Sequence, residues 1–245
     1  MTSATAQRHQ PRAQLLAKRI YAFGDIHGCT RLLEEVWQKV EVDLRQRSLP
    51  LEHVLEIYLG DYLDRGPDSK GVVERLIQRR AAGRALCLAG NHEDIALKAL
   101  DDLKTFSRWL LLGAPETLIS YGIRPPLRQA HDVARAHREY RAGFPESHRR
   151  FLRSLPLFHV NGSCLFVHAG LRPGVPLEHQ LAADLTMIRQ PFLSFRGDHG
   201  YLVVHGHTPV REPEIMRNRV NIDTGAFATG RLTCLAIEGD ELRVL

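Results

Sequence analysis

The sequence predicts an α/β fold in which two β-sheets pack together and helices cover their outer faces. In about the first hundred residues, short apolar runs alternate with segments of helical periodicity, which is typical of strand–helix units in a layered sheet. Toward the carboxyl end, short strand-type runs follow one another instead. Polar side chains of metal-binding types stand directly after five of these runs, at strand ends where α/β folds hold their sites.

Three strand–helix units make up the first part of the chain. Apolar runs at residues 20–23, 54–59 and 85–89 predict strands. The segment at residues 30–47 predicts a helix, because its apolar side chains recur on one face: Leu33, Val36, Trp37, Val40 and Leu44.

The second and third helices are marked by caps and by periodicity. Asp68 stands where a helix cap is needed, and Gly83 would end the helix that follows it. The third helix, after residue 90, is expected to carry four apolar residues: Ile95, Leu97, Leu100 and Leu103.

Residues 106–155 depart from this alternation. They contain four prolines, and their second half is rich in arginine and histidine. We expect a mostly helical insertion over the core, because its arginines need solvent and its leucines need a surface to cover. Its basic face is interpreted first as a solvated helix surface and second as a rim that steers phosphate.

Strand-type runs return after Pro156. They occupy residues 165–167, 202–204, 220–222, 232–237 and 242–245. The pair Gly239-Asp240 separates the last two and predicts a hairpin turn. Because the sequence shows no internal repeat or low-complexity linker, we expect one domain at residues 19–245, preceded by a flexible tail at residues 1–18.

Composition limits the partners and the cellular setting. A net charge of +5 suits an anionic ligand but is too small to demand nucleic acid, and the 7% aromatic content includes no stacking cluster. No apolar run is long enough to cross a bilayer, and four widely separated cysteines suggest neither a disulfide framework nor a zinc knuckle. We therefore expect a cytoplasmic protein without a nucleic-acid or membrane partner.

Five short motifs follow the apolar runs, and each sets a metal-binding or phosphate-binding side chain beside a glycine. In order they are Gly24-Asp25-Ile26-His27-Gly28, Gly60-Asp61-Tyr62-Leu63-Asp64-Arg65-Gly66, Gly90-Asn91-His92-Glu93, His168-Ala169-Gly170 and Gly206-His207-Thr208. Together they could supply ligands for two adjacent metal ions, with an acid and an arginine for phosphoryl chemistry.

The first two motifs supply carboxylates, an imidazole and a guanidinium. Asp25 and His27 can converge on one ion, although an aspartate in such a turn is often only a helix cap. Asp61 can bridge two cations with its two carboxylate oxygens. Arg65 offers a planar fork that matches two phosphoryl oxygens, or alternatively a structural salt bridge.

The third motif adds an amide oxygen and a candidate proton donor. Asn91 is a hard neutral ligand, and His92 can point past the metals toward a leaving group. Asp64 could hydrogen-bond the other ring nitrogen of His92 and raise the pKa of that imidazole. The alternative is a capping Asn91 beside a surface His92.

The last two motifs add histidines after strands. A lone histidine at such a position is usually a satisfied core residue, but His168 and His207 follow three loops of the same construction, which favours ligands. His205 competes with His207, because it stands only two residues away.

These five motifs resemble those of the phosphoprotein phosphatase family within the calcineurin-like metallophosphoesterases, in particular its small bacterial and bacteriophage serine/threonine phosphatases. The likeness runs from about Ile20 to the carboxyl end and includes the segment Asn221-Ile222-Asp223-Thr224-Gly225. It implies a four-layer αββα sandwich with two mixed sheets. Ala89 departs from the pattern, since the eukaryotic protein phosphatases usually carry a basic residue there.

The resemblance also implies a role for each site residue. The first of two divalent metal ions would be held by Asp25, His27 and Asp61, and the second by Asp61, Asn91, His168 and His207. His92 would be the general acid with Asp64 as its partner, and Arg65 would contact phosphate. A second phosphate-binding arginine is assigned to Arg189, with Arg196 as the alternative. Manganese is the expected metal, with iron or zinc as alternatives.

Three functions follow from this set of residues. The leading expectation is hydrolysis of a phosphomonoester, on a phosphorylated protein or a small phosphoester, by hydroxide that bridges the two metals. The alternative is symmetrical hydrolysis of diadenosine tetraphosphate, because enzymes of that kind share most of these motifs. The third is a catalytically silent phosphate-binding scaffold, which the presence of a competent side chain at every position argues against.

Overall fold

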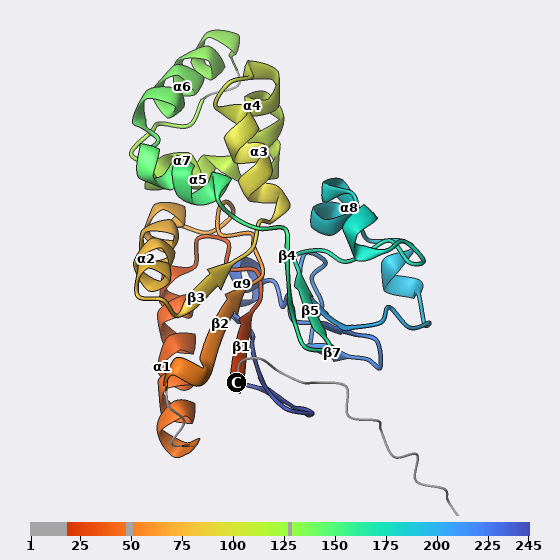
Figure 1. Cartoon of the computed structure of the whole chain (residues 1–245). Helices are drawn as coiled ribbons and strands as arrows, with labels where there is room; N and C mark the ends of the chain where they lie inside the picture. The colour runs from red at the N-terminus through yellow and green to blue at the C-terminus, as the bar shows by residue number, and fades with distance from the viewer. Residues whose placement is uncertain (1–18, 48–50, 127–128) are drawn as a thin grey trace, which may run out of the picture.

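Two five-stranded mixed sheets form the centre of the molecule. The computed structural model describes residues 19–47, 51–126 and 129–245, so the expected tail at residues 1–18 lies outside the described residues. The strand orders are β10-β9-β1-β2-β3 in the first sheet and β4-β5-β6-β8-β7 in the second. With helices on their outer sides, as Figure 1 shows, the sheets form the sandwich expected from the sequence.

In the first sheet, three parallel strands are joined by an antiparallel hairpin. The parallel strands are β1 (Arg19–Phe23), β2 (Val54–Tyr58) and β3 (Ala85–Cys87). The hairpin is β9 (Cys234–Glu238) and β10 (Glu241–Val244), and β9 pairs with β1. The turn expected at Gly239-Asp240 is confirmed, since Glu238 pairs with Glu241 across it.

The second sheet also has three parallel strands, but an antiparallel strand that the sequence did not reveal lies at each of its edges. Its parallel strands are β5 (Cys164–Val167), β6 (Leu202–His205) and β8 (Arg219–Asn221). The antiparallel edge strands β4 (Phe158–Asn161) and β7 (Glu214–Ile215) were not predicted. Neither shows a strong apolar signal, because β4 is only half-buried and β7 has two residues.

Alternating side chains of the strands build separate cores on the two faces of each sheet. In β1, Ile20 and Ala22 face the second sheet, where they pack with residues such as Phe166 and Val204. Tyr21, between them in sequence, packs instead among the residues of the helix-covered core. This two-residue period is what a strand buried on both faces requires.

The helices over the first sheet begin and end as predicted. They are α1 (Thr30–Arg47) and α2 (Ser69–Ala81), which cover the outer face of that sheet in Figure 1. Asp68 caps α2 by accepting the backbone N–H of Gly71 at 2.8 Å. Gly83, with φ of +76°, follows the end of α2 in the left-handed conformation that glycine adopts most readily.

The third helix is shorter than expected. α3 (Asn91–Ala99) ends before Leu100, and α4 (Leu103–Trp109) is a separate helix, so the prediction of one helix through Leu103 is wrong. The reason is Asp102, whose carboxylate accepts the N–H groups of Lys104 and Thr105 and so starts a new helix.

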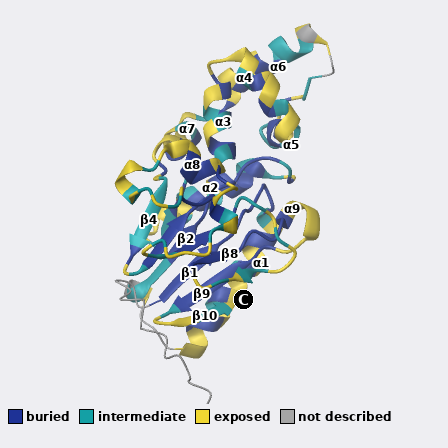
Figure 2. Ribbon diagram, turned by 90° about the vertical axis from the view of Figure 1, so that its right-hand side faces the viewer, coloured by how far each residue is buried: buried dark blue, intermediate teal, exposed yellow. Residues whose placement is uncertain are grey.

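The remaining elements are further α-helices and 3₁₀ turns. After α4 come a 3₁₀ turn (Leu110–Leu112), α5 (Ala114–Ser120), α6 (Ala130–Gly143) and α7 (Glu146–Arg153). The remaining elements are α8 (Ala182–Met187), α9 (Ala226–Thr229) and 3₁₀ turns at Leu51–His53, Leu177–His179 and Phe192–Ser194. Figure 2 shows much of the exposed surface on the helices from α3 to α7, while central strands such as β1 and β8 are buried. Within the described ranges, no helix combines the length and apolar character that a bilayer span needs.

A buried ionic cluster joins α1 to the central strand β1 and the edge strand β10 of the first sheet. Asp43 of α1 accepts hydrogen bonds from Tyr21 Oη at 2.6 Å and Arg19 Nη1 at 2.9 Å, and it also pairs with Arg243 of β10. Burial alone would raise the pKa of Asp43, but the hydrogen bonds from Tyr21 and Arg243 and the two arginine charges outweigh it and lower that pKa. The ionised carboxylate therefore stabilises the fold.

Candidate dinuclear metal centre and active site

The five motif loops converge at one place, at the carboxyl ends of parallel strands from both sheets. Ligand atoms of His27, Asp61 and His92 lie within 4.8 Å of one another, and so do those of Asp61, His168 and His207. Asp61 belongs to both groups, so its carboxylate lies where it could bridge two cations.

Two of the histidines are oriented by backbone carbonyl groups. The Nδ1 atom of His27 lies 2.7 Å from the carbonyl oxygen of Leu63, and that of His168 lies 3.0 Å from the carbonyl oxygen of Leu59. These contacts favour the tautomer that carries its proton on Nδ1, which leaves Nε2 as the ring atom with a lone pair that a metal ion can use. Both Nε2 atoms face Asp61, at 3.5 and 3.4 Å from its carboxylate oxygens.

Asn91 and Asp25, the other two expected ligands, lie beside the second group, whereas the first group contains His92, the expected acid, and not Asp25. Asn91 Oδ1 lies 3.1 Å from His168 Nε2, and Asp25 Oδ2 accepts the backbone N–H of His207 at 3.1 Å. Burial raises the pKa of Asp25 well above its usual range, and the charges of Asp223 and Asp61 raise it further. A divalent cation among these carboxylates would offset their repulsion, so the oxygen and nitrogen donors present fit such ions.

The backbone at this site adopts conformations that residues other than glycine rarely adopt. Among the described residues, positive φ angles outside glycine occur at His27, Asp61, Asp64, Arg65 and His207, with values from 45° to 73°. All five are candidate site residues. Such conformations persist where surrounding structure holds them in place, and they cluster at functional sites.

His92 is held by the buried carboxylate of Asp64, which side chains of α4 and α5 hold in place. His92 Nδ1 lies 2.6 Å from Asp64 Oδ2, which also accepts a hydrogen bond from Trp109 Nε1 at 2.7 Å. Thr117 Oγ1 donates to the other oxygen of Asp64 at 2.6 Å. Burial would lower the pKa of His92, but Asp61 and Asp64 outweigh it and raise that pKa to about 9, as a proton donor at neutral pH requires.

Arg65 lies between the two imidazoles. Its Nη1 atom is 3.2 Å from His27 Nε2, and its Nη2 atom is 3.2 Å from His92 Nε2. Its backbone N–H donates to the carbonyl oxygen of Gly113 at 3.0 Å. In the described part of the chain, no carboxylate lies within ion-pair distance of Arg65, which disfavours a structural salt bridge and leaves the guanidinium available to an anion.

The family follows from comparison with known proteins. Residues 18–229 match the family model described as calcineurin-like phosphoesterase. The chain belongs to the calcineurin-like phosphoesterases. This family is one of metal-dependent hydrolases, so the membership implies divalent metal ions, for which the residues grouped around Asp61 are possible ligands.

Several relatives in sequence are named as enzymes that act on dinucleoside tetraphosphates. This phosphoesterase is 29% identical to the asymmetrical bis(5'-nucleosyl)-tetraphosphatase PrpE of Anoxybacillus flavithermus, over 86% of its own chain and 87% of that protein. It is 27% identical to the PrpE protein of Halalkalibacterium halodurans, with the same coverage. These names agree with the tetraphosphatase alternative better than with the leading protein phosphatase expectation, although they specify asymmetrical rather than symmetrical cleavage.

Solved structures share the fold. A crystal structure described as that of a candidate diadenosine tetraphosphatase gives a TM-score of 0.65 at 24% identity, covering 94% of both chains. The cold-active protein-tyrosine phosphatase of a Shewanella species gives a TM-score of 0.59 at 17% identity, covering 99% of this chain and 82% of that one. At such identities the likeness concerns the fold alone.

Glu93 joins two motif loops of the phosphoesterase, a role that the sequence did not reveal. Its carboxylate accepts the backbone N–H groups of Asp61 and Tyr62 at 2.8 Å and that of Gly90 at 2.9 Å. The loops after β2 and β3 are therefore fixed relative to each other. The only available signal was its place in the third motif.

The alternative candidates for the histidine ligand and for the second arginine lie in different surroundings. His205 is fully buried, with its Nε2 atom 3.4 Å from Arg219 Nη1, and it belongs to neither ligand group. Arg196 lies against the sulfur of Met216 at 3.1 Å. Arg189, by contrast, lies within electrostatic range of His207: burial is the main cause that lowers the pKa of His207 to about 3, and the charge of Arg189 contributes.

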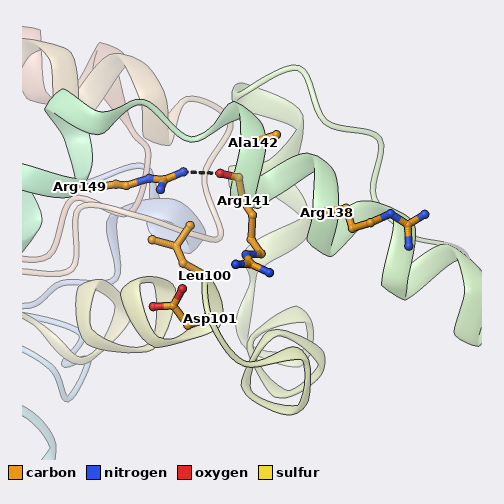
Figure 3. A pocket seen from close by; sticks show the side chains of 6 residues that line it. All are labelled: Leu100, Asp101, Arg138, Arg141, Ala142 and Arg149. Carbon is orange, nitrogen blue, oxygen red and sulfur yellow. Dashed lines mark hydrogen bonds between the residues drawn. The ribbon is translucent and has the colours of Figure 1, made fainter.

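The arginines that α6 and α7 contribute to one cavity do not converge on a common point. They border a cavity of about 380 Å³, which is lined by Leu100, Asp101, Arg138, Arg141, Ala142 and Arg149. Arg149 Nε donates to the carbonyl oxygen of Phe144 at 3.0 Å, and another nitrogen of Arg149 bonds to that of Arg141. Figure 3 shows Arg138 pointing away from the other two arginines. This arrangement favours the solvated-surface interpretation over a phosphate-steering rim.

Proposed function

We propose that this phosphoesterase hydrolyses dinucleoside tetraphosphates with two divalent metal ions, and that it cleaves them asymmetrically. The observation that carries the proposal is the shared carboxylate of Asp61, which belongs to two ligand groups beside Arg65 and His92. The PrpE relatives, which align over 86% of the chain, support the choice of substrate.

The ligand set proposed for the two ions is the one expected from the sequence. It comprises Asp25, His27, Asp61, Asn91, His168 and His207, with Asp61 common to both ions. Manganese is the proposed metal, with iron or zinc as alternatives. When bound, two such ions would neutralise charge on phosphoryl oxygens and lower the pKa of water.

The side chains around the proposed ions have distinct tasks. Arg65 holds phosphoryl oxygens of the bound polyphosphate with its forked guanidinium, and Arg189 adds positive charge from the side of His207. Asp64 fixes the ring of His92 through Nδ1, so that Nε2 faces the same space as Arg65. His92 then donates a proton to the phosphate oxygen that leaves.

The products of cleavage test the proposal directly. The protein is incubated with manganese and diadenosine tetraphosphate, and the nucleotides are separated by ion-exchange chromatography, with chelated protein as the control. Asymmetrical hydrolysis splits the four phosphates unequally and yields ATP and AMP in equal amounts, whereas symmetrical hydrolysis yields only ADP. A phosphopeptide panel runs in parallel.

Each outcome has a clear meaning. ADP alone would replace asymmetrical by symmetrical cleavage. A preference for phosphopeptides by orders of magnitude would restore the protein phosphatase expectation. Absence of metal-dependent cleavage of either substrate, and of any aryl phosphate, would leave a silent phosphate-binding protein.

A further inference from the structure

An exposed aromatic side chain borders the candidate metal centre. Phe227 keeps 42% of its surface exposed, although large apolar side chains are usually buried. Its ring lies 5.5 Å from the ring of His27 in an edge-on arrangement, and the guanidinium carbon of Arg65 lies 5.0 Å from its centroid. The exposed surface of Phe227 therefore lies next to His27, a proposed metal ligand, and Arg65, a proposed phosphate-binding residue.

The local backbone holds Phe227 in this position. It lies in the one-turn helix α9, between Gly225 and Gly230, which both adopt left-handed conformations. Asp223 Oδ1 accepts the N–H of Gly225 at 2.9 Å, and Thr229 Oγ1 donates to the carbonyl oxygen of Thr224 at 2.8 Å. The neighbouring Ala226 is buried. An anchored turn thus presents a rigid ring to solvent at the edge of the site.

We infer that Phe227 is the stacking platform for a nucleobase of the substrate, an inference that rests on the proposed function. One ribose separates a nucleobase from its first phosphate, so a nucleotide whose phosphate contacts Arg65 can place its base against the neighbouring ring. Every nucleobase has a flat π-face, so an aromatic ring binds it without base-specific hydrogen bonds. Phe227 sets specificity for nucleotides over phosphoesters that lack a planar group.

The position of Arg65 supports this assignment. The guanidinium lies over the Phe227 ring and also contacts His27 and His92, so one cation joins the aromatic ring to the candidate catalytic groups. A nucleotide bound here would place its negative charge on Arg65 and its apolar base on the exposed part of Phe227. A phosphoserine side chain would use only the first of these contacts.

Two substrates separate base recognition from phosphate chemistry. Diadenosine tetraphosphate is compared with linear inorganic tetraphosphate, which keeps the phosphate chain and has no base. The variants are Phe227→Ala, which removes the ring, and Phe227→Tyr, which keeps it. Ile215→Ala is the matched control, because Ile215 is 54% exposed on the edge strand β7 and belongs to no part of the site.

The expected result is a change in substrate preference. Phe227→Ala should lower the ratio of kcat/KM for the dinucleotide to kcat/KM for tetraphosphate by roughly tenfold or more, through a higher KM. Phe227→Tyr should keep this ratio of kcat/KM values within about threefold of that of the parent protein, since the π-face is retained. Ile215→Ala should leave both substrates unaffected. An equal loss for both substrates in Phe227→Ala, or no loss at all, would overturn the inference.

An equilibrium measurement keeps the inference separate from the proposed function. Binding of AMP and of inorganic phosphate to the purified protein is measured by titration calorimetry. Phe227→Ala should weaken AMP roughly tenfold more than phosphate, whether or not the dinucleotide is cleaved. If the parent protein binds AMP no better than phosphate, the stacking role is refuted. If AMP shows the expected loss but the dinucleotide is not hydrolysed, the proposed function fails and the base site stands.

Discussion

Replacing Trp109 by phenylalanine removes the indole N–H that donates to Asp64 Oδ2 at 2.7 Å, while most of the ring volume stays. Asp64 is fully buried, so water cannot replace the lost donor. A hydrogen bond to a buried charge contributes about 1.5–3 kcal/mol. For a protein of this size, that loss should lower Tm by roughly 3–12 °C.

The same change should reduce turnover. The oxygen that loses its donor is the one that holds His92 Nδ1 at 2.6 Å, so the imidazole becomes less firmly oriented. Because small misplacements of catalytic groups are costly, kcat should fall by roughly tenfold or more with little change in KM. Thr117→Val, which removes the donor to the other oxygen of Asp64 at 2.6 Å, should act in the same direction.

Trp37 provides the matched control. Its indole N–H donates to the hydroxyl of Tyr58 at 2.8 Å, on the side of the sheet covered by α1. Trp37→Phe makes the same chemical change at a neutral partner, so it should cost only about 0.5–1.5 kcal/mol and leave kcat unchanged. Steady-state kinetics and thermal unfolding are measured on all variants. If Trp109→Phe keeps the kcat of the parent protein, the orientation of His92 does not depend on this hydrogen bond.

Three further perturbations address the acid, the metals and the fold. His92→Asn should lower kcat by roughly a hundredfold with little change in KM, and an unchanged kcat would remove His92 from the acid role. Asp61→Ala should abolish binding of both metal ions, and elemental analysis that still finds two per chain would refute its shared position. Asp43→Asn should lower the free energy of unfolding by about 1.5–3 kcal/mol at neutral pH, because it removes one of the two carboxylates that pair with the buried Arg19, which keeps Glu238. The pKa of Asp43 is lower in the folded protein than in the unfolded chain. Its contribution to stability is therefore present above the ordinary aspartate pKa of about 3.9 and is lost as the pH falls through the folded-state pKa. Denaturation curves in which Asp43→Asn loses as much stability at strongly acidic pH as at neutral pH would contradict this pH dependence.

The fold was predictable where the signal is local. The bounds of α1 follow from its apolar face, and the start of α2 follows from Asp68. The strand β4 has no comparable signal, because it is half-buried and gains its place only by pairing with β5. Periodicity across Leu100 and Leu103 was misleading, since one capping residue between them decides where the helix stops.

The candidate site also contains some residues that a local sequence signal indicates and others that only the folded structure reveals. The motif residues were predictable because each stands directly after its own strand, and the sheets bring those strand ends together. Trp109 and Thr117 carry no motif, and they reach Asp64 from 45 and 53 residues away in sequence. Their roles depend on how α4 and α5 pack against the loop of Asp64, which periodicity does not encode. Phe227 likewise becomes notable only through its exposure beside Arg65.

The left-handed backbone at His27, Asp61, Asp64, Arg65 and His207 bears on any attempt to transplant this chemistry. A free peptide carrying G-D-x-x-D-R-G would relax into ordinary conformations, because these angles are unfavourable for residues with a side chain. The donor atoms would then diverge, and metal affinity would be lost although every ligand remained in the sequence. A grafted site would need the strand ends of both sheets, together with the carboxylate of Glu93 that joins two of the loops.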